Sequence, residues 1–66
     1  MQKVVLTTDG VQIDCFYVPE FTTAQNSVIN HIANDRAKNR ATITDEITGD
    51  LRVYFVVNDR LNISVF

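Results

Sequence analysis

Residues that hold small domains together covalently or through metals are nearly missing from this chain. Its 66 residues include one cysteine, Cys15, and one histidine, His31. A single cysteine forms no internal disulfide, and with one histidine it cannot supply the ligands of a structural zinc site. We therefore expect no disulfide, no metal and no cofactor. A lone thiol is typical of a reducing compartment, so we expect a cytoplasmic protein.

Long apolar runs, a signal peptide and an excess of basic residues are also lacking. The longest apolar run extends from Val53 to Val57, whereas a membrane-spanning helix needs about 20 residues. The N-terminal region shows no leader pattern of basic, apolar and small residues. A net charge of −2 provides no basic field for phosphate backbones. We expect no membrane insertion, and nucleic-acid binding is disfavoured.

The apolar residues that are present are enough for one folded core. They make up 45% of the chain, and so short a chain cannot build two cores, which predicts a single domain over residues 1–66. A core of this size contributes only roughly 3–5 kcal/mol of stability. Self-association is therefore the expected further source of stability, most simply as a dimer.

The clearest local signal is a hairpin at the start of the chain. Apolar and β-branched runs at residues 2–8 and 11–18 flank Asp9-Gly10, which suits a two-residue type I′ turn. Uninterrupted alternation from this turn pairs Val4 with Cys15 and directs both toward the core. Cys15 is thus predicted to be a buried, unreactive thiol.

One helix is predicted after the hairpin. Pro19 ends the second strand, and Thr22 to Gln25 fit a capping box, so we place a helix at about 22–38. Its apolar residues fall on one stripe, which we expect to pack on a sheet. Basic residues gather at its end, where they complement the helix dipole: Arg36, Lys38 and Arg40.

The remaining residues predict a three-stranded meander at about 40–46, 50–57 and 61–66. Three-residue loops at 47–49 and 58–60 keep the alternation consistent, with Ile43 opposite Val53. The predicted fold is an α+β, ββαβββ two-layer sandwich: a largely antiparallel five-stranded sheet with one helix on one face.

The face of the sheet that the helix leaves uncovered is the most informative expected feature. Aromatic and arginine side chains are what protein interfaces favour. The predicted partner-binding residues on this face are Phe16, Tyr54, Val56, Phe66, Arg40 and Arg52.

No pattern in the sequence predicts catalysis. His31 and Asp35 are four residues apart on the expected helix, as in a base oriented by a carboxylate, but no motif places a nucleophile beside them. We interpret His31 as a helix-surface histidine, expect no catalytic residues, and predict that the protein is not an enzyme.

The function predicted is a non-enzymatic protein-binding module that associates with itself and with another protein. Both ends fall in expected strands, as in a complete small gene product, and proteins this small are often phage or mobile-element inhibitors of a host protein, acting in the host cytoplasm. One alternative is a structural or assembly protein. Another is a binder of a small ligand or nucleotide phosphate, in which the phosphate contacts are Arg36, Lys38, Arg40 and His31.

Overall fold

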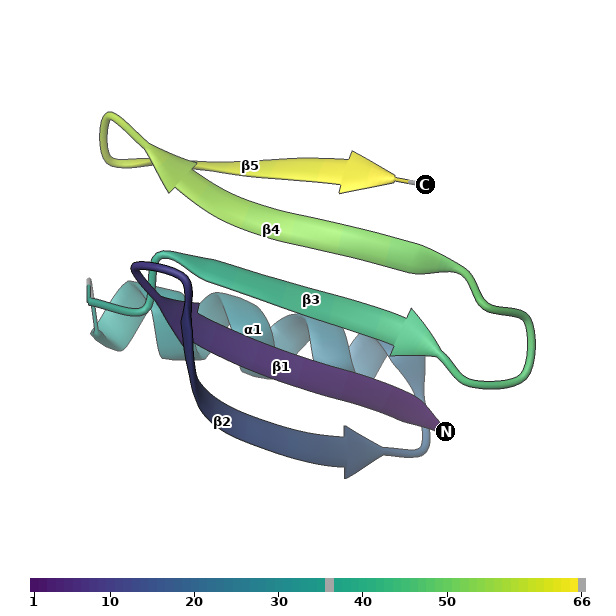
Figure 1. Cartoon of the computed structure of the whole chain (residues 1–66). Helices are drawn as coiled ribbons and strands as arrows, with labels where there is room; N and C mark the ends of the chain where they lie inside the picture. The colour runs from purple at the N-terminus through teal and green to yellow at the C-terminus, as the bar shows by residue number, and fades with distance from the viewer. Residues whose placement is uncertain (36, 66) are drawn as a thin grey trace.

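The protein is described from a computed structural model, which defines residues 1–35 and 37–65. The elements in chain order are β1 (Gln2–Thr8), β2 (Val11–Val18), α1 (Phe21–Asn34), β3 (Arg40–Asp45), β4 (Leu51–Val57) and β5 (Arg60–Val65). The strands form one antiparallel sheet in the order β2-β1-β3-β4-β5, and α1 lies on one of its faces (Figure 1). The predicted ββαβββ two-layer fold is confirmed.

The helix is shorter than predicted. Glu20 is its N-cap and makes no side-chain cap bond, so the capping box expected at Thr22 and Gln25 is wrong. At the other end the side chain of Asp35 accepts a hydrogen bond from the Ala37 amide (3.1 Å). Such local bonding offers the backbone an alternative to further helical turns, which accounts for the end at Asn34.

The first hairpin combines the predicted turn with a β-bulge. Asp9 and Gly10 both have positive φ angles, 50° and 84°, as a type I′ turn requires. Beyond the turn the register shifts, so that Ile13 is an extra residue in β2. Val4 consequently lies opposite Phe16, and the predicted pair of Val4 and Cys15 is wrong.

The loop between β3 and β4 is one residue longer than predicted. Its four residues, Glu46 to Gly49, lie between Asp45 and Asp50, where the Asp45 amide donates to the Asp50 carbonyl (2.9 Å). Gly49 has a φ of 78°, a conformation that favours glycine. Thr42 therefore lies opposite Val53, and the predicted partner Ile43 is wrong.

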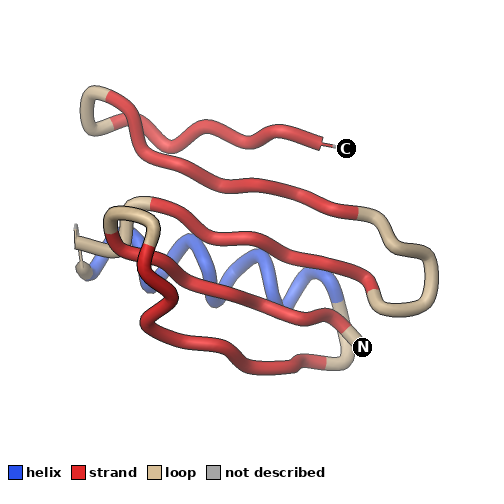
Figure 2. Tube along the Cα trace, in the orientation of Figure 1, coloured by secondary structure: helices blue, strands red, loops and turns tan. Residues whose placement is uncertain are grey.

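The turn between β4 and β5 is one residue shorter than predicted. Asn58 and Asp59 form a two-residue turn with φ angles of 52° and 61°, so Val57 pairs with Arg60. The longer loop before β4 exchanges the two faces of that strand relative to the prediction. The shorter turn after β4 restores the predicted faces in β5. Figure 2 shows this turn at the same end of the sheet as the Asp9-Gly10 turn, with the β3–β4 loop at the other end.

The core lies between α1 and the helix side of the sheet. Tyr54 lies opposite Ala41 and is fully buried, and Ala24 of the helix belongs to the same cluster. The bulky tyrosine ring thus shares the cluster with two small side chains. The other fully or nearly buried members of the cluster are Val4, Leu6, Val28, Ile32 and Ile43.

The helix covers only part of the sheet. It packs on β1, β2 and β3, whereas β5 extends beyond it (Figure 1). Apolar residues on the helix side of β5 consequently remain partly exposed. Within the described part of the chain, no helix is long and apolar enough to cross a membrane.

Candidate functional site

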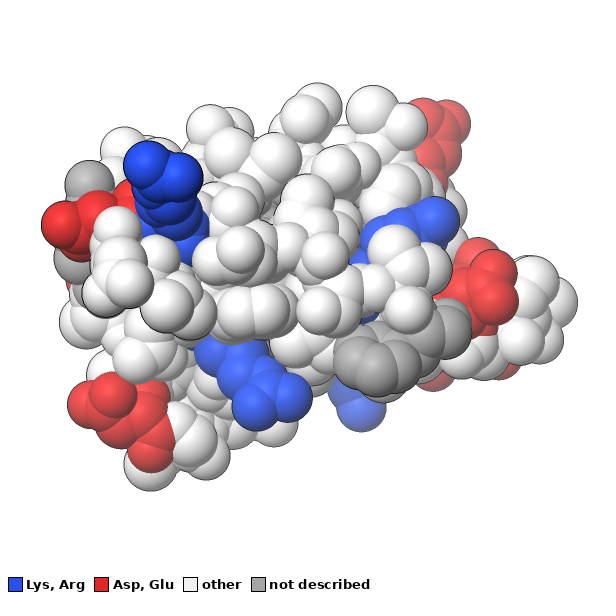
Figure 3. Space-filling view, turned by 90° about the horizontal axis from the view of Figure 1, so that it is seen from above, with Lys and Arg blue, Asp and Glu red and all other residues white. Residues whose placement is uncertain are grey.

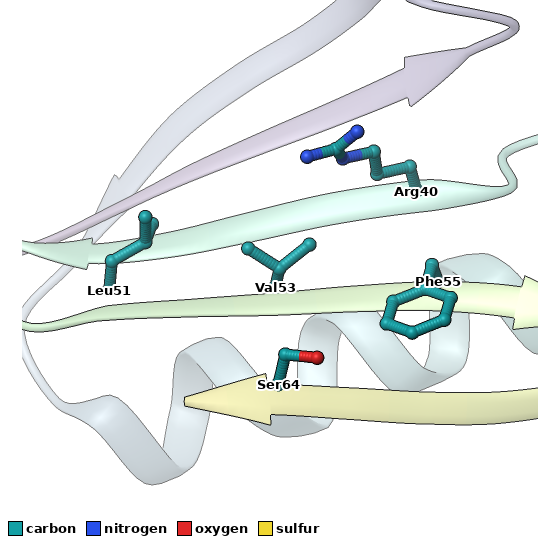
Figure 4. A pocket seen from close by; sticks show the side chains of 5 residues that line it. All are labelled: Arg40, Leu51, Val53, Phe55 and Ser64. Atoms are coloured by element: carbon teal, nitrogen blue, oxygen red, sulfur yellow. The ribbon is translucent and has the colours of Figure 1, made fainter. Parts of the chain in front are cut away.

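A hollow of about 500 Å³ lies on the uncovered face of the sheet. Val53 forms its floor and is only 7% exposed. Leu51 and Phe55 flank Val53 along β4, while Arg40 extends from β3 and Ser64 from β5 (Figure 4). All five side chains lie on one face because alternate residues of a strand point the same way, and Arg40 is opposite Phe55.

The charge of this hollow comes from Arg40. Its carbonyl accepts a hydrogen bond from the Thr7 hydroxyl (3.2 Å), but within the described residues its guanidinium contacts no carboxylate. The chain as a whole has a net charge of −2. An unpaired guanidinium beside an apolar floor is therefore a local exception, and it favours an acidic or carbonyl group on whatever binds here.

The rest of the uncovered face is mixed in character. Its centre carries threonines, and its β2 edge carries Cys15 opposite Val5 and Tyr17 opposite Lys3. Cys15 is exposed, so its predicted burial is wrong; the bulge at Ile13 turned it away from the helix. Tyr17 is 51% exposed and adds an aromatic ring at this edge.

The structure divides the predicted partner-binding residues between the two faces. Arg40 lies on the uncovered face, as expected. The placement of Phe16, Tyr54, Val56 and Arg52 there is wrong, because the bulge and the longer loop turn all four toward the helix side. Phe66 lies outside the described residues.

Two of these four residues, Arg52 and Phe16, contact side chains of α1. The guanidinium carbon of Arg52 lies 4.2 Å from the centroid of the Phe21 ring, a cation–π contact. The Phe16 ring lies against His31, with centroids 5.8 Å apart. These side chains stabilise the two layers and are not free to act as rim or anchor residues for a partner.

The predicted phosphate-binding residues are not brought together. Lys38 donates to Nδ1 of His31 (3.3 Å), since an ammonium group can only donate. His31 packs on the helix side against Phe16, whereas Arg40 points from the opposite face. Arg36 lies outside the described residues. No single anion can bridge groups on two faces of a sheet.

The geometry forms no catalytic pair from the candidate side chains. The Asp35 side chain bonds the Ala37 amide and makes no hydrogen bond to His31 among the described residues. Cys15 and His31 lie on opposite faces of the sheet, so no thiol–imidazole pair exists. The described residues contain no group of three or more His, Cys, Asp or Glu side chains placed to hold a metal ion.

A second exposed surface follows the helix side of β5. Leu61, Ile63 and Val65 are 38%, 48% and 68% exposed. Leu61 also borders a groove of about 280 Å³ whose other walls include Ile29 and Val56. Figure 3, which views the molecule from the β5 side, shows uncharged residues across its middle, lysine and arginine residues beside them, and acidic residues toward its ends.

Residues of the hollow were not identified from the sequence, except Arg40. The three-residue loop predicted before β4 pairs Val53 with Ile43 and so places Val53 on the core side, whereas the four-residue loop turns Val53, with Leu51 and Phe55, to the uncovered face. The one local signal of the true register between β4 and β5 is the Asn58-Asp59 dipeptide, because both residues tolerate positive φ and fit a two-residue turn.

In comparisons with known proteins, no family model, curated protein or solved structure matches this chain.

Proposed function

We propose that the protein is a non-enzymatic protein-binding module that occupies the surface of another protein, with the hollow on its uncovered face as the contact site, and that it also associates with itself. The observation that carries the first part is the guanidinium of Arg40, which contacts no carboxylate among residues 1–35 and 37–65 and lies beside the apolar residues Leu51, Val53 and Phe55. Aromatic, aliphatic and arginine side chains in one depression are typical of interface anchors.

The shape of the hollow favours a protein over a free small molecule. All of its lining residues belong to neighbouring strands of one sheet face, so no second wall closes over it. Small-ligand sites bury most of the ligand surface, whereas an open depression suits a side chain presented by a partner. The partner segment best matched is an apolar side chain next to a carboxylate.

Capture of a partner from cells of the native host tests the contact site. Wild-type protein is compared with Phe55→Ser, which removes an apolar wall, and Arg40→Glu, which reverses the charge. Ile47→Ser is the control, because Ile47 is 87% exposed in the β3–β4 loop, away from the hollow. Each variant is first checked for folding by circular dichroism.

We expect the same captured protein with the wild type and the control, and its loss with both hollow variants. Equal capture by all four proteins would show that the contact site lies outside the hollow. If the captured protein is a host enzyme whose activity falls on binding, the protein acts as an inhibitor, as proposed for small phage or mobile-element products.

A further inference from the structure

The outer strand β5 presents an unoccupied edge whose backbone groups can be assigned. The two-residue turn at Asn58-Asp59 makes Val57 and Arg60 a hydrogen-bonded pair. In an antiparallel ladder the bonding direction alternates along the strand. Asn62 and Ser64 therefore direct their amides and carbonyls at β4, and the backbone groups directed outward belong to Leu61, Ile63 and Val65.

The same three residues carry the exposed apolar side chains of β5. Leu61, Ile63 and Val65 point to the helix side, where Leu61 is opposite Val56 and Ile63 is opposite Tyr54. The helix packs mainly on β1, β2 and β3 (Figure 1), and these three side chains remain partly exposed. Free backbone groups and uncovered apolar side chains thus coincide on one short segment, which is what strand addition requires.

This segment is complementary to a second copy of itself. In an antiparallel pair centred on Ile63, Ile63 lies opposite Ile63 of the second copy, and Leu61 lies opposite Val65. Every outward backbone group then meets a partner, because the three residues of each copy form hydrogen-bonded pairs. A register centred on Asn62 pairs Leu61 with Ile63 and leaves Val65 without an apolar partner. A register centred on Ser64 pairs Ile63 with Val65 and leaves Leu61 without one.

No charge opposes this pairing. Residues 61–65 contain no ionisable side chain, and the polar positions match Asn62 with Ser64 on the other face. Figure 3 shows uncharged residues across the middle of this side, with lysine and arginine residues beside them. Two copies of an acidic protein can therefore approach here without placing like charges opposite each other.

The opposite edge of the sheet is protected, which limits the assembly to two copies. β2 contains the bulge at Ile13, and Pro19 follows its end. The Asp14 carboxylate accepts the amide hydrogen of Cys15 (2.9 Å) beside that bulge. Bulges, prolines and charged residues are devices that prevent edge pairing, and β5 has none of them between residues 61 and 65.

We propose that two copies of the chain pair through β5, antiparallel about Ile63, to form a closed two-fold dimer with one continuous sheet. This inference specifies the self-association in the proposed function and rests on that part of it alone. The two-fold axis lies perpendicular to the sheet, so both helices are on the same face. Leu61, Ile63 and Val65 of both copies form an apolar floor between the helices, next to Ile29 of each.

Sedimentation at increasing concentration tests the proposal with the wild type, Ile63→Lys and Ile63→Glu. Each substitution places two like charges together at the axis, so we expect association at least about tenfold weaker than in the wild type. An equimolar mixture of the two variants places lysine opposite glutamate and should restore a dimer. Ile47→Lys and Val11→Lys, in the exposed loop and on the β2 edge, should associate as the wild type does.

Amide hydrogen exchange provides a readout that needs no substitution. The amides of Leu61, Ile63 and Val65 face solvent in a monomer and should become protected only at concentrations where the dimer forms. A wild type that stays monomeric would overturn both this inference and the proposed self-association. A dimer unaffected by Ile63→Lys, or one that leaves these amides unprotected, would overturn the β5 pairing while self-association stands. Neither result bears on partner capture through the hollow.

Discussion

Leu6 of β1 lies opposite Asp14 of β2, with Ile13 inserted as the extra residue of a bulge. The bulge exchanges the faces of every later residue in β2. Phe16 consequently packs beneath the sheet against the helix, while Cys15 and Tyr17 lie on the uncovered face.

The thiol of Cys15 should therefore react in the native protein. Cys15 is exposed, so we expect a disulfide reagent such as DTNB to label it without denaturant at a rate close to that of the unfolded chain. The control combines Cys15→Ser with Val4→Cys, because Val4 is fully buried beneath the helix. That thiol should react only through unfolding. Slow native labelling of Cys15 would contradict the bulge.

Tyr54→Phe should not weaken the fold. The Tyr54 hydroxyl is buried and has no hydrogen-bond partner among the described residues, and burial raises the pKa of this phenol. Removing an unsatisfied hydroxyl should raise the free energy of unfolding by about 1 kcal/mol. Urea denaturation measures this change. Tyr17→Phe, at a 51% exposed site, should change it by less than about 0.5 kcal/mol. A clear loss with Tyr54→Phe would mean that the hydroxyl is bonded.

Asp45 should make the stability of the protein depend on pH under acid conditions. Its carboxylate accepts bonds from the Thr48 amide (3.0 Å), the Gln2 side chain (2.8 Å) and the Ile47 amide (2.9 Å), which lower its pKa from 3.8 to about 2. A depressed folded-state pKa stabilises the protein above the unfolded value, and this contribution is lost as the pH falls from about 4 to about 2.

Urea unfolding at pH 7 and at about pH 2.5 measures this effect. The stability lost between these two conditions should be smaller for Asp45→Asn than for the wild type, because the variant has no carboxylate to protonate there. Asp50→Asn, at the other end of the same loop, is the matched control and should follow the wild type. Equal pH dependence in Asp45→Asn and the wild type would show that these bonds do not depend on its charge.

Local sequence patterns determined which segments form strands and where the helix lies. The Asp9-Gly10 turn followed from residues that tolerate positive φ, and the two-layer fold followed from one amphipathic helix among five strands. The one-residue errors in the predicted loops before and after β4 cancel, so the side-chain alternation that those loops predict for β5 agrees with the structure, where Leu61, Ile63 and Val65 lie on the helix side. The pattern could not show that the helix stops short of β5.

The faces of β2 and β4, and with them the residues of the hollow, were decided by tertiary structure. Side chains alternate with a period of two, so one extra residue at Ile13 or in the Glu46–Gly49 loop reverses an entire strand. Both faces of β4 are apolar, with Val53 and Phe55 on one and Tyr54 and Val56 on the other, and hydrophobicity alone does not choose between them. The choice follows from tertiary packing, in which Tyr54 joins Ala24 and Ala41 in the buried cluster beneath the helix.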